Sequence, residues 1–303
     1  MMPTVGIPRG LLYYRYETLW KKFFSNLNVE YIISSKSNFK ILNDGKNKCV
    51  DETCLSLKLF IGHVESLKDK CDYVFIPRIY SLEKTEQVCT NFNCLYDLVH
   101  NLYPKLKIID YNIDIKHNKT EKKAFISLGK QLGFSRKKSL IAYQNAKKFE
   151  KEKKLEAEQK QNEKLCTNKT KILLLGHPYN LNDELIGKMV SNFLINSNVE
   201  IIYSYELPKK YVNNYSKEIS PKVHWTMNKE LLASFMYYKE KVDGVIVITA
   251  FPCGPDSLTN EMILRKKGKS KVLLLTFEEL SSDVAVITRL ESFLDMIKKG
   301  VYI

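Results

Sequence analysis

The chain has 303 residues, of which 44% are hydrophobic and 27% charged, and its formal net charge is +14 at pH 7. This composition suits a soluble globular protein of about two domains. No run of eighteen or more apolar residues occurs, so we expect no transmembrane helix, and residues 1–9 lack the features of a secretory signal. Seven cysteines, an odd set without a disulfide-like framework, favour reduced thiols in the cytoplasm.

The positive charge is concentrated in one segment. Between Lys116 and Lys171 there are 17 Lys and Arg residues against 6 Glu, which is a surplus of 11 out of the total of 14. Residues 147–164 have the pattern of a solvated helix with little apolar face, and aromatic residues are too sparse there for base stacking. This location argues against a nucleic-acid partner and favours a wet, basic helical surface.

The first part of the chain predicts strands that alternate with helices, and we assign residues 1–118 to an N-terminal α/β domain. Short apolar runs predict the strands, and amphipathic spacing predicts the helices between them. The predicted strands cover residues 4–7, 29–34, 73–76 and 107–110, and the predicted helices cover residues 13–27, 39–43, 57–67 and 95–102.

A basic helical connector over residues 119–170 then leads to a C-terminal α/β domain over residues 171–303. In that domain the predicted strands cover residues 171–175, 199–203, 242–248 and 271–276, and the predicted helices cover residues 183–195 and 288–299. Continuous apolar strands between helices are typical of parallel sheets that are covered on both faces. We therefore predict an α/β protein with two similar parallel-sheet domains facing across a cleft.

Three cysteines stand where loops lead into helices. Cys54 and Cys89 precede helical patterns in the first half, and Cys253 comes after the apolar run 245–248. The positive end of a helix dipole favours the thiolate that metals bind, so the three thiols are candidate ligands for a soft metal or an iron–sulfur cluster. Taken singly, each cysteine is also compatible with simple burial as a small apolar residue.

Polar side chains follow the first strand of each half. Each of these strands ends in a Gly-x-Pro turn, and Arg9 and His177 lie in these turns, at the strand ends where open α/β sheets bind ligands. Arg78 follows the strand 73–76 and needs an acidic partner if it is buried, for which Glu52 is a candidate. His63, among apolar residues of a helix, is better explained as a packed, hydrogen-bonded residue than as a ligand.

Several stretches resemble those of the activase-related 2-hydroxyacyl-CoA dehydratase proteins, a domain found alone or fused behind an ATP-hydrolysing activase. The resemblance runs through nearly the whole chain in order and is weakest in the basic middle, with Cys-Gly-Pro-Asp-Ser as its most specific element. The stretches are residues 6–11 (GIPRGL), 50–55 (VDETCL), 62–64 (GHV), 75–78 (FIPR), 176–180 (GHPYN), 253–257 (CGPDS) and 288–293 (TRLESF).

This resemblance implies a pair of α/β domains that hold a [4Fe–4S] cluster between them. By position, the recurring cysteines of the family fall on Cys54, Cys89 and Cys253, which leaves one iron without a cysteine. Cys94 or Cys49 could complete the set, although a structural role is favoured for both. The related double-cubane proteins make a larger cluster the alternative cofactor.

The resemblance also implies a function. The protein would accept low-potential electrons from a separate ATP-dependent activase, and it would pass them on or act on a small or CoA-linked substrate. If the chain is catalytic, its chemistry would be dehydratase- or reductase-like, as in anaerobic metabolism. A cluster-free binding or regulatory module of the same fold is the alternative.

Overall fold

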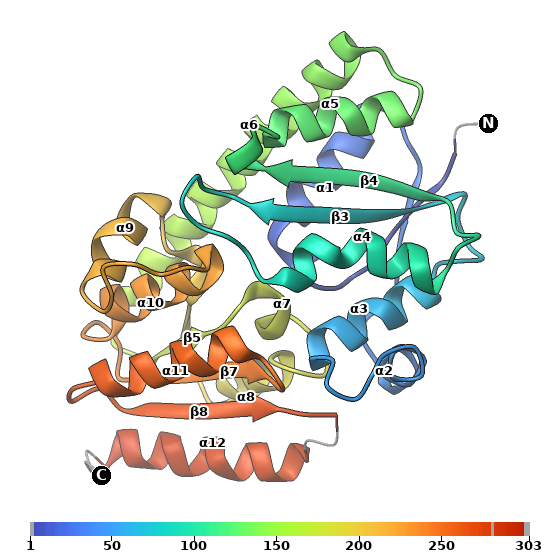
Figure 1. Cartoon of the computed structure of the whole chain (residues 1–303). Coiled ribbons are helices and arrows are strands. Elements are labelled where there is room, and N and C mark those ends of the chain that lie inside the picture. The colour runs from blue at the N-terminus through green and yellow to red at the C-terminus, as the bar shows by residue number, and fades with distance from the viewer. Residues whose placement is uncertain (1–2, 280–281, 300–303) are drawn as a thin grey trace. The chain divides into compact units, whose positions relative to one another are not determined.

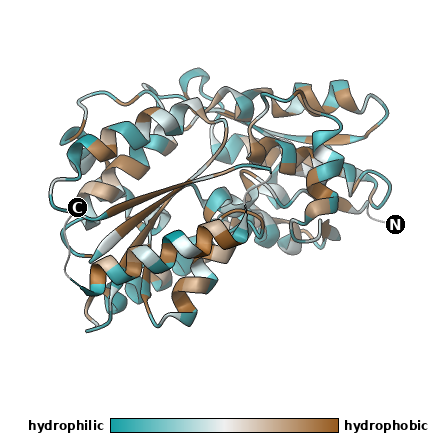
Figure 2. Ribbon diagram, turned by 90° about the horizontal axis from the view of Figure 1, so that it is seen from below, coloured by the Kyte–Doolittle hydropathy of each residue, from teal (hydrophilic) through white to brown (hydrophobic). Residues whose placement is uncertain are grey.

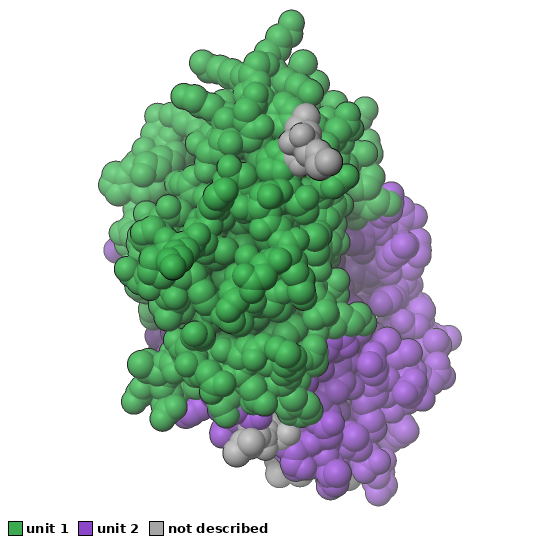
Figure 3. All heavy atoms as spheres, turned by 90° about the vertical axis from the view of Figure 1, so that its right-hand side faces the viewer, with its two compact units in different colours: residues 1–154, 224–226 green, residues 155–223, 227–303 purple. Residues whose placement is uncertain are grey.

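Eight apolar segments form strands in two separate sheets (Figure 1). The structure is a computed structural model that describes residues 3–279 and 282–299. The chain divides into two units, which Figure 3 shows in different colours. Unit 1 comprises residues 1–154 and 224–226, and unit 2 comprises residues 155–223 and 227–303. The connector predicted over residues 119–170 is thus shared between the units, with the division at residues 154 and 155.

Both sheets have the same topology. In unit 1 the strand order is β2-β1-β3-β4, in unit 2 it is β6-β5-β7-β8, and all six neighbouring pairs are parallel. This confirms the predicted fold class of two similar parallel sheets. The strands are β1 (Val5–Ile7), β2 (Tyr31–Ile33), β3 (Tyr73–Ser81), β4 (Ile108–Asp114), β5 (Lys171–Leu175), β6 (Glu200–Tyr203), β7 (Gly244–Ala250) and β8 (Val272–Phe277).

The helices of unit 1 connect its strands in the right order for a doubly wound sheet. The strand order changes direction between β1 and β3, and that point of a parallel sheet is where ligand sites form. The helices are α1 (Tyr13–Asn26), α2 (Phe39–Lys46), α3 (Leu55–Glu65), α4 (Thr90–Leu102), α5 (Glu121–Gln131) and the first part of α6 (Arg136–Leu165).

Unit 2 repeats this plan, with the corresponding point between β5 and β7. Its sheet is apolar along its length, as the brown strands in Figure 2 show, and all seven residues of β7 are buried. Besides the end of α6, its helices are α7 (Pro178–Leu181), α8 (Lys188–Asn196), α9 (Lys209–Lys217), α10 (Thr226–Tyr238), α11 (Gly254–Lys266) and α12 (Asp283–Lys298).

An aromatic cluster forms the core of unit 1. Trp20 from α1 meets Phe75 of β3 edge-on at a centroid distance of 4.8 Å, and Tyr111 of β4 lies 5.8 Å from both rings. Phe125 of α5 closes the cluster 5.0 Å from Tyr111. All four side chains are almost fully buried, and edge-to-face pairs add about 0.5–1.5 kcal/mol each beyond the area they bury.

Helices α2 and α3 cross at unusually short range because glycine stands at both contact points. A methyl group at Gly45 would lie 1.8 Å from the carbonyl oxygen of Lys58, and one at Gly62 would lie 1.9 Å from that of Ile41. The two backbones are therefore in direct contact, which fixes the position of α3 and with it the residue at its start.

The basic helix α6 is largely exposed, but polar side chains connect it to other elements within each unit. In unit 1, Lys147 pairs with Glu121 of α5 at 2.8 Å, and Glu150, which is 5% exposed, pairs with Lys147 and with Lys154 of the same helix at 2.8 Å. In unit 2, the amide of Gln161 donates to the Tyr203 carbonyl and to the Tyr238 hydroxyl. The solvated helix predicted over residues 147–164 thus makes polar contacts with other elements that its sequence pattern did not predict.

One predicted helix is wrong in its extent. Residues 183–195 were expected to form a single helix, but α8 begins only at Lys188, and residues 183–187 form a turn that follows α7. Gly187 makes this turn, since a methyl group there would lie 2.6 Å from the Leu181 Cα atom, and Asp183 accepts the N–H of Leu185 at 2.9 Å. Among the described helices, none is both long and apolar enough to cross a membrane.

Candidate functional site

The three candidate cysteines occupy the same local position in the fold. Cys54, Cys89 and Cys253 are the N-cap residues of α3, α4 and α11, and each is partly buried. A thiol at an N-cap lies beside the first backbone N–H groups of the helix and its positive dipole end. The predicted placement at helix starts is therefore confirmed.

Within unit 1 the starts of α3 and α4 are neighbours. The side-chain amide of Asn91, two residues after Cys89, lies 3.7 Å from the Cys54 sulfur and donates to it. This contact brings the surroundings of Cys54 and Cys89 together although the two residues are 35 positions apart in the chain. Sequence reasoning missed Asn91, because an amide in the first turn of a helix has no distinguishing pattern.

The two other cysteines considered as ligands have different surroundings. The Cys94 thiol donates to the Asn91 carbonyl one turn earlier in α4 at 3.7 Å. Burial raises the pKa of Cys94, and burial also raises that of Cys49 despite the nearby Lys58. A raised pKa opposes the thiolate that a metal requires, which agrees with the structural role expected for both residues.

In unit 2 Cys253 is part of a buried polar network. Asp256, 2% exposed, accepts from the imidazole Nε2 of His177 at 2.8 Å, from the Asn228 amide at 2.8 Å and from the Cys253 thiol. Burial raises the pKa of the Asp256 carboxyl, but the charge and hydrogen bond of His177, with the other two donors, hold it below its usual value. The ring of Tyr179 stacks on His177 at 4.9 Å.

Asp256 is the third residue of α11, whose cap residue is Cys253. This is the spacing of a capping box, but the Asp256 carboxylate bonds His177 and Asn228 and not the start of its own helix. Asn228, from the start of α10, has no sequence signal because its contact depends on the tertiary fold alone.

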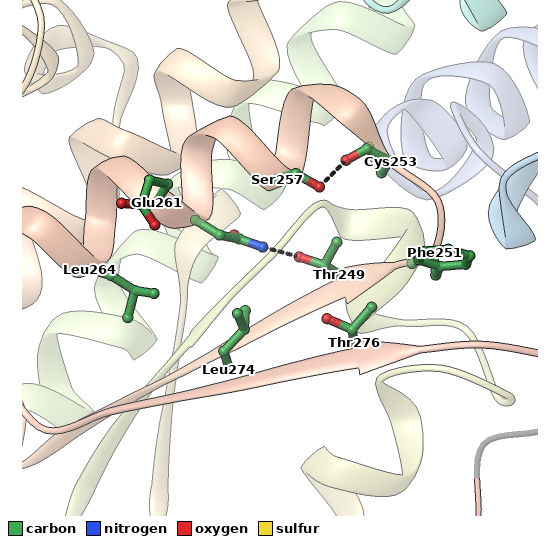
Figure 4. Close-up of a pocket in the computed structure, with 10 residues that line it drawn as sticks. Thr249, Phe251, Cys253, Ser257, Glu261, Leu264, Leu274 and Thr276 are labelled. Atoms are coloured by element: carbon green, nitrogen blue, oxygen red, sulfur yellow. Dashed lines mark hydrogen bonds between the residues drawn. The ribbon is translucent and has the colours of Figure 1, made fainter.

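A small pocket opens beside Cys253 (Figure 4). It has a volume of about 200 Å³ and lies between α11 and the strands β7 and β8. Leu264 and Leu274 provide apolar walls, and Thr249 and Thr276 provide hydroxyl groups at the carboxyl ends of the two strands. The pocket is thus large enough for a small molecule or part of one, next to the thiol of unit 2.

The repeat between the units extends to hydrogen bonds at the strand ends. In unit 1 the Arg9 N–H donates to the hydroxyl of Ser34, which follows β2, at 2.8 Å. In unit 2 the Gly176 N–H donates to the hydroxyl of Ser204, which follows β6, at 3.2 Å. A serine after the second strand therefore fixes the turn after the first strand in both units.

The predicted anion-binding residues Arg9, Arg78 and His177 have different partners. Arg78 lies inside β3 and not after its end. It pairs with Asp97 of α4 and stacks on the Tyr96 ring, so its acidic partner is Asp97 and not Glu52 as suggested. His177 is held by Asp256. Arg9 has no carboxylate partner among the described residues.

His63 of the first unit is structural, as expected. His63 is fully buried, and its two ring nitrogens lie 2.9 Å from the Ser34 hydroxyl and 3.0 Å from the Ser37 hydroxyl. Burial, assisted by the charge of Arg9, lowers the pKa of His63 to about 3, so the ring is neutral at pH 7. Within residues 3–279 and 282–299 taken together, no group of three His, Cys, Asp or Glu side chains is arranged to hold a metal ion.

Comparisons with known proteins give one substantial match. The profile of a family described as "CoA enzyme activase uncharacterised domain (DUF2229)" matches residues 4–206, which is more than half of the chain. No curated protein matches.

The solved structures that match this chain are distant. The SBP FpvC of Pseudomonas aeruginosa in complex with Ni²⁺ has 11% identity and a TM-score of 0.29, with 100% of this chain and 99% of that chain covered. The laminin binding protein Lmb of Streptococcus agalactiae has 12% identity and a TM-score of 0.29, with 97% and 98% covered. At this level of similarity neither structure informs the function.

Proposed function

Because the chain belongs to the family of CoA enzyme activase-related domains, we propose that it is an iron–sulfur protein that receives low-potential electrons from an ATP-dependent activase. Cys54, Cys89 and Cys253 are the proposed ligands of a [4Fe–4S] cluster, with a larger double-cubane cluster as the alternative. When bound, such a cluster supplies the one-electron storage that the amino acids lack.

The observation that carries the proposal is the shared position of the three thiols at helix N-caps. Their residue type fits the proposed group, since iron–sulfur clusters are held by cysteine thiolates. The dipole of each helix favours the anionic sulfur, and partial burial keeps the surroundings less polar than water. Three thiols that each occupy an environment of this kind are better explained by metal ligation than by chance burial.

Neighbouring side chains would tune such a centre. The Asn91 amide donates to the Cys54 sulfur, and hydrogen bonds to ligand sulfur change the reduction potential of a cluster. The Asp256 carboxylate accepts a hydrogen bond from the Cys253 thiol, and this bond orients the cysteine side chain. No atom lies within 4 Å of a methyl group placed on Gly254, so the backbone next to Cys253 can be approached closely.

The substrate side of the proposal is a small or CoA-linked molecule. The pocket beside Cys253 provides space for a small group in unit 2, and Arg9, Arg78 and His177 are the candidate substrate-binding residues. Since Arg78 and His177 already have carboxylate partners, Arg9 is the most available cation of the three. Any chemistry on the substrate would be dehydratase- or reductase-like.

The test is spectroscopic. The whole chain is prepared without oxygen, supplied with iron and sulfide, and reduced either with dithionite or with an activase and ATP. We expect a low-temperature electron paramagnetic resonance signal of a reduced cluster, and we expect ATP hydrolysis to be required with the activase. Reduction without any such signal would overturn the proposal and favour the cluster-free binding module.

Variants identify the ligands. Cys54→Ser, Cys89→Ser and Cys253→Ser are each expected to change or abolish the signal. Cys166→Ser is the matched control, because Cys166 is an exposed thiol just after α6. A signal that survives unchanged in the three ligand variants would show that the ligands are assigned wrongly.

A further inference from the structure

The loop over residues 82–88 leads from β3 into Cys89, the N-cap residue of α4. Residues 83–85 of this loop are exposed, whereas Gln87 is half-buried. An exposed connection with few packed side chains opens easily, so its conformation depends on the bonds made by its more buried part. Gln87, which stands two positions before Cys89, makes such bonds.

All four polar groups of Gln87 have hydrogen-bond partners. Its N–H donates to the His224 carbonyl, and its carbonyl accepts from the Thr226 N–H, both at 2.9 Å. These two bonds pair Gln87 with Trp225 in an isolated parallel bridge. In the side chain, the amide nitrogen donates to the Tyr80 hydroxyl at 2.8 Å, and the amide oxygen lies 2.9 Å from the Nε2 atom of His224. One residue thus joins a distant segment of the chain to the end of β3.

This distant segment is a strap of three residues, 224–226. The strap belongs to unit 1, although the segments on either side of it, residues 155–223 and 227–303, belong to unit 2. Within the strap, the Trp225 ring meets the His224 ring edge-on at 5.5 Å, and His224 is exposed. The hydrogen bonds to Gln87 therefore attach a short, partly exposed segment to the loop before Cys89.

The backbone between Gln87 and the start of α4 is also fixed. Val88, the single residue between Gln87 and Cys89, is 5% exposed, and its N–H donates to the Tyr80 carbonyl at 3.2 Å. The Cys89 carbonyl accepts from the Phe92 N–H in the first turn of the helix at 3.0 Å. Because the residues on both sides of Cys89 are bonded, its side chain starts from one fixed backbone position.

We propose that Gln87 is a positioning residue, which places the Cys89 thiol by fixing the strap to the end of β3. The proposal rests on the proposed function in that Cys89 is taken as a cluster ligand, but the effect on the thiol does not require a cluster. Ligands must be held to within about 0.5 Å of their working geometry, and hydrogen bonds of neighbouring residues achieve this. Gln87→Ala keeps the two backbone bonds to the strap and loses both side-chain bonds, so it should loosen the loop without unfolding unit 1.

The first test uses the reduced, metal-free full chain. The rate at which iodoacetamide alkylates each cysteine is measured by mass spectrometry at constant pH. In Gln87→Ala we expect Cys89 to react about fivefold faster or more, which corresponds to the loss of one hydrogen bond. Cys71 of unit 1, whose thiol donates to the Leu67 carbonyl at 3.3 Å, should react at its wild-type rate. An unchanged rate at Cys89, or an equal acceleration at Cys71, would overturn the inference.

Two further variants separate positioning from general support of the fold. His224→Ala removes the strap side of the same bond, so it should also accelerate Cys89, and adding it to Gln87→Ala should change little. Gln131→Ala is the matched control, because the Gln131 amide likewise bonds a backbone, the N–H and carbonyl of Asp110 at 3.1 and 3.0 Å, but connects α5 to β4. If Gln131→Ala accelerates Cys89 as much as Gln87→Ala does, the positioning role is refuted.

A second readout keeps this inference apart from the proposed function. After reconstitution and reduction with dithionite, Gln87→Ala should retain the wild-type iron content but show shifted g values and a shifted reduction potential, because ligand geometry and hydrogen bonds tune both. The same g values and potential in wild type and variant would contradict the positioning role. A wild-type chain without any cluster signal would refute the proposed function instead, and the alkylation rates would then decide the role of Gln87.

Discussion

Mild acid should destabilise unit 1 through its buried histidine His63. Its pKa is about 3 in the folded protein and about 6.5 in the unfolded chain. The unfolded state therefore binds a proton as the pH falls below 6.5, whereas the folded state does not. The stability that the neutral ring contributes is fully present above pH 6.5 and is lost progressively towards pH 3.

The size of this effect follows from the two pKa values. Between pH 7 and pH 5 the free energy of unfolding should fall by about 2 kcal/mol, since each pKa unit corresponds to about 1.4 kcal/mol. Urea unfolding measured by tryptophan fluorescence is the assay, because Trp20 and Trp225 both belong to unit 1 and are the two tryptophans of the chain.

The control is His63→Gln, which keeps a donor and an acceptor for the two serines but cannot titrate in this range. It should be less stable than the wild type at pH 7, and its stability should change little between pH 7 and pH 5. If wild type and variant lose the same amount of stability over this interval, the buried neutral histidine is not the cause and the reasoning is refuted.

Two further predictions concern packing and the buried network. Gly45→Ala should destabilise unit 1 by about 1–3 kcal/mol or more, because its methyl group meets the Lys58 carbonyl, whereas Gly254→Ala has open space and should leave the thermal midpoint nearly unchanged. A large loss in Gly254→Ala with none in Gly45→Ala would contradict the packing. Asp256→Ala should cost about 3–5 kcal/mol in denaturant unfolding of unit 2, since it leaves His177 buried without its acceptor. A loss below 1 kcal/mol would show that the pair is not the main support of that network.

Much of the fold could be predicted because local patterns and final structure agree. The strand predicted over residues 171–175 is β5 to the residue, and the helix predicted over residues 13–27 is α1 with one residue fewer. Apolar runs of this kind fit only a sheet covered on both faces, so periodicity and length suffice. The turn over residues 183–187 was missed, because it depends on the contact of Gly187 with Leu181.

The candidate site was predictable in part. The N-cap positions of Cys54, Cys89 and Cys253 follow from loop-to-helix transitions that are visible in the sequence. The partners of the site residues were not predictable, since Asp97 for Arg78 and Asn228 for Asp256 come from other elements. Such pairs depend on the tertiary fold, and a single sequence contains no signal for them.

The most direct test of the central claim is the iron and acid-labile sulfide content of the chain after anaerobic reconstitution. We predict about four irons and four sulfides per chain, the stoichiometry of one cubane cluster, with marked loss in the serine variants of Cys54, Cys89 and Cys253 but not of Cys166. A wild-type protein that retains no iron, or variants that retain as much iron as the wild type, would contradict the claim that these three thiols hold a cluster.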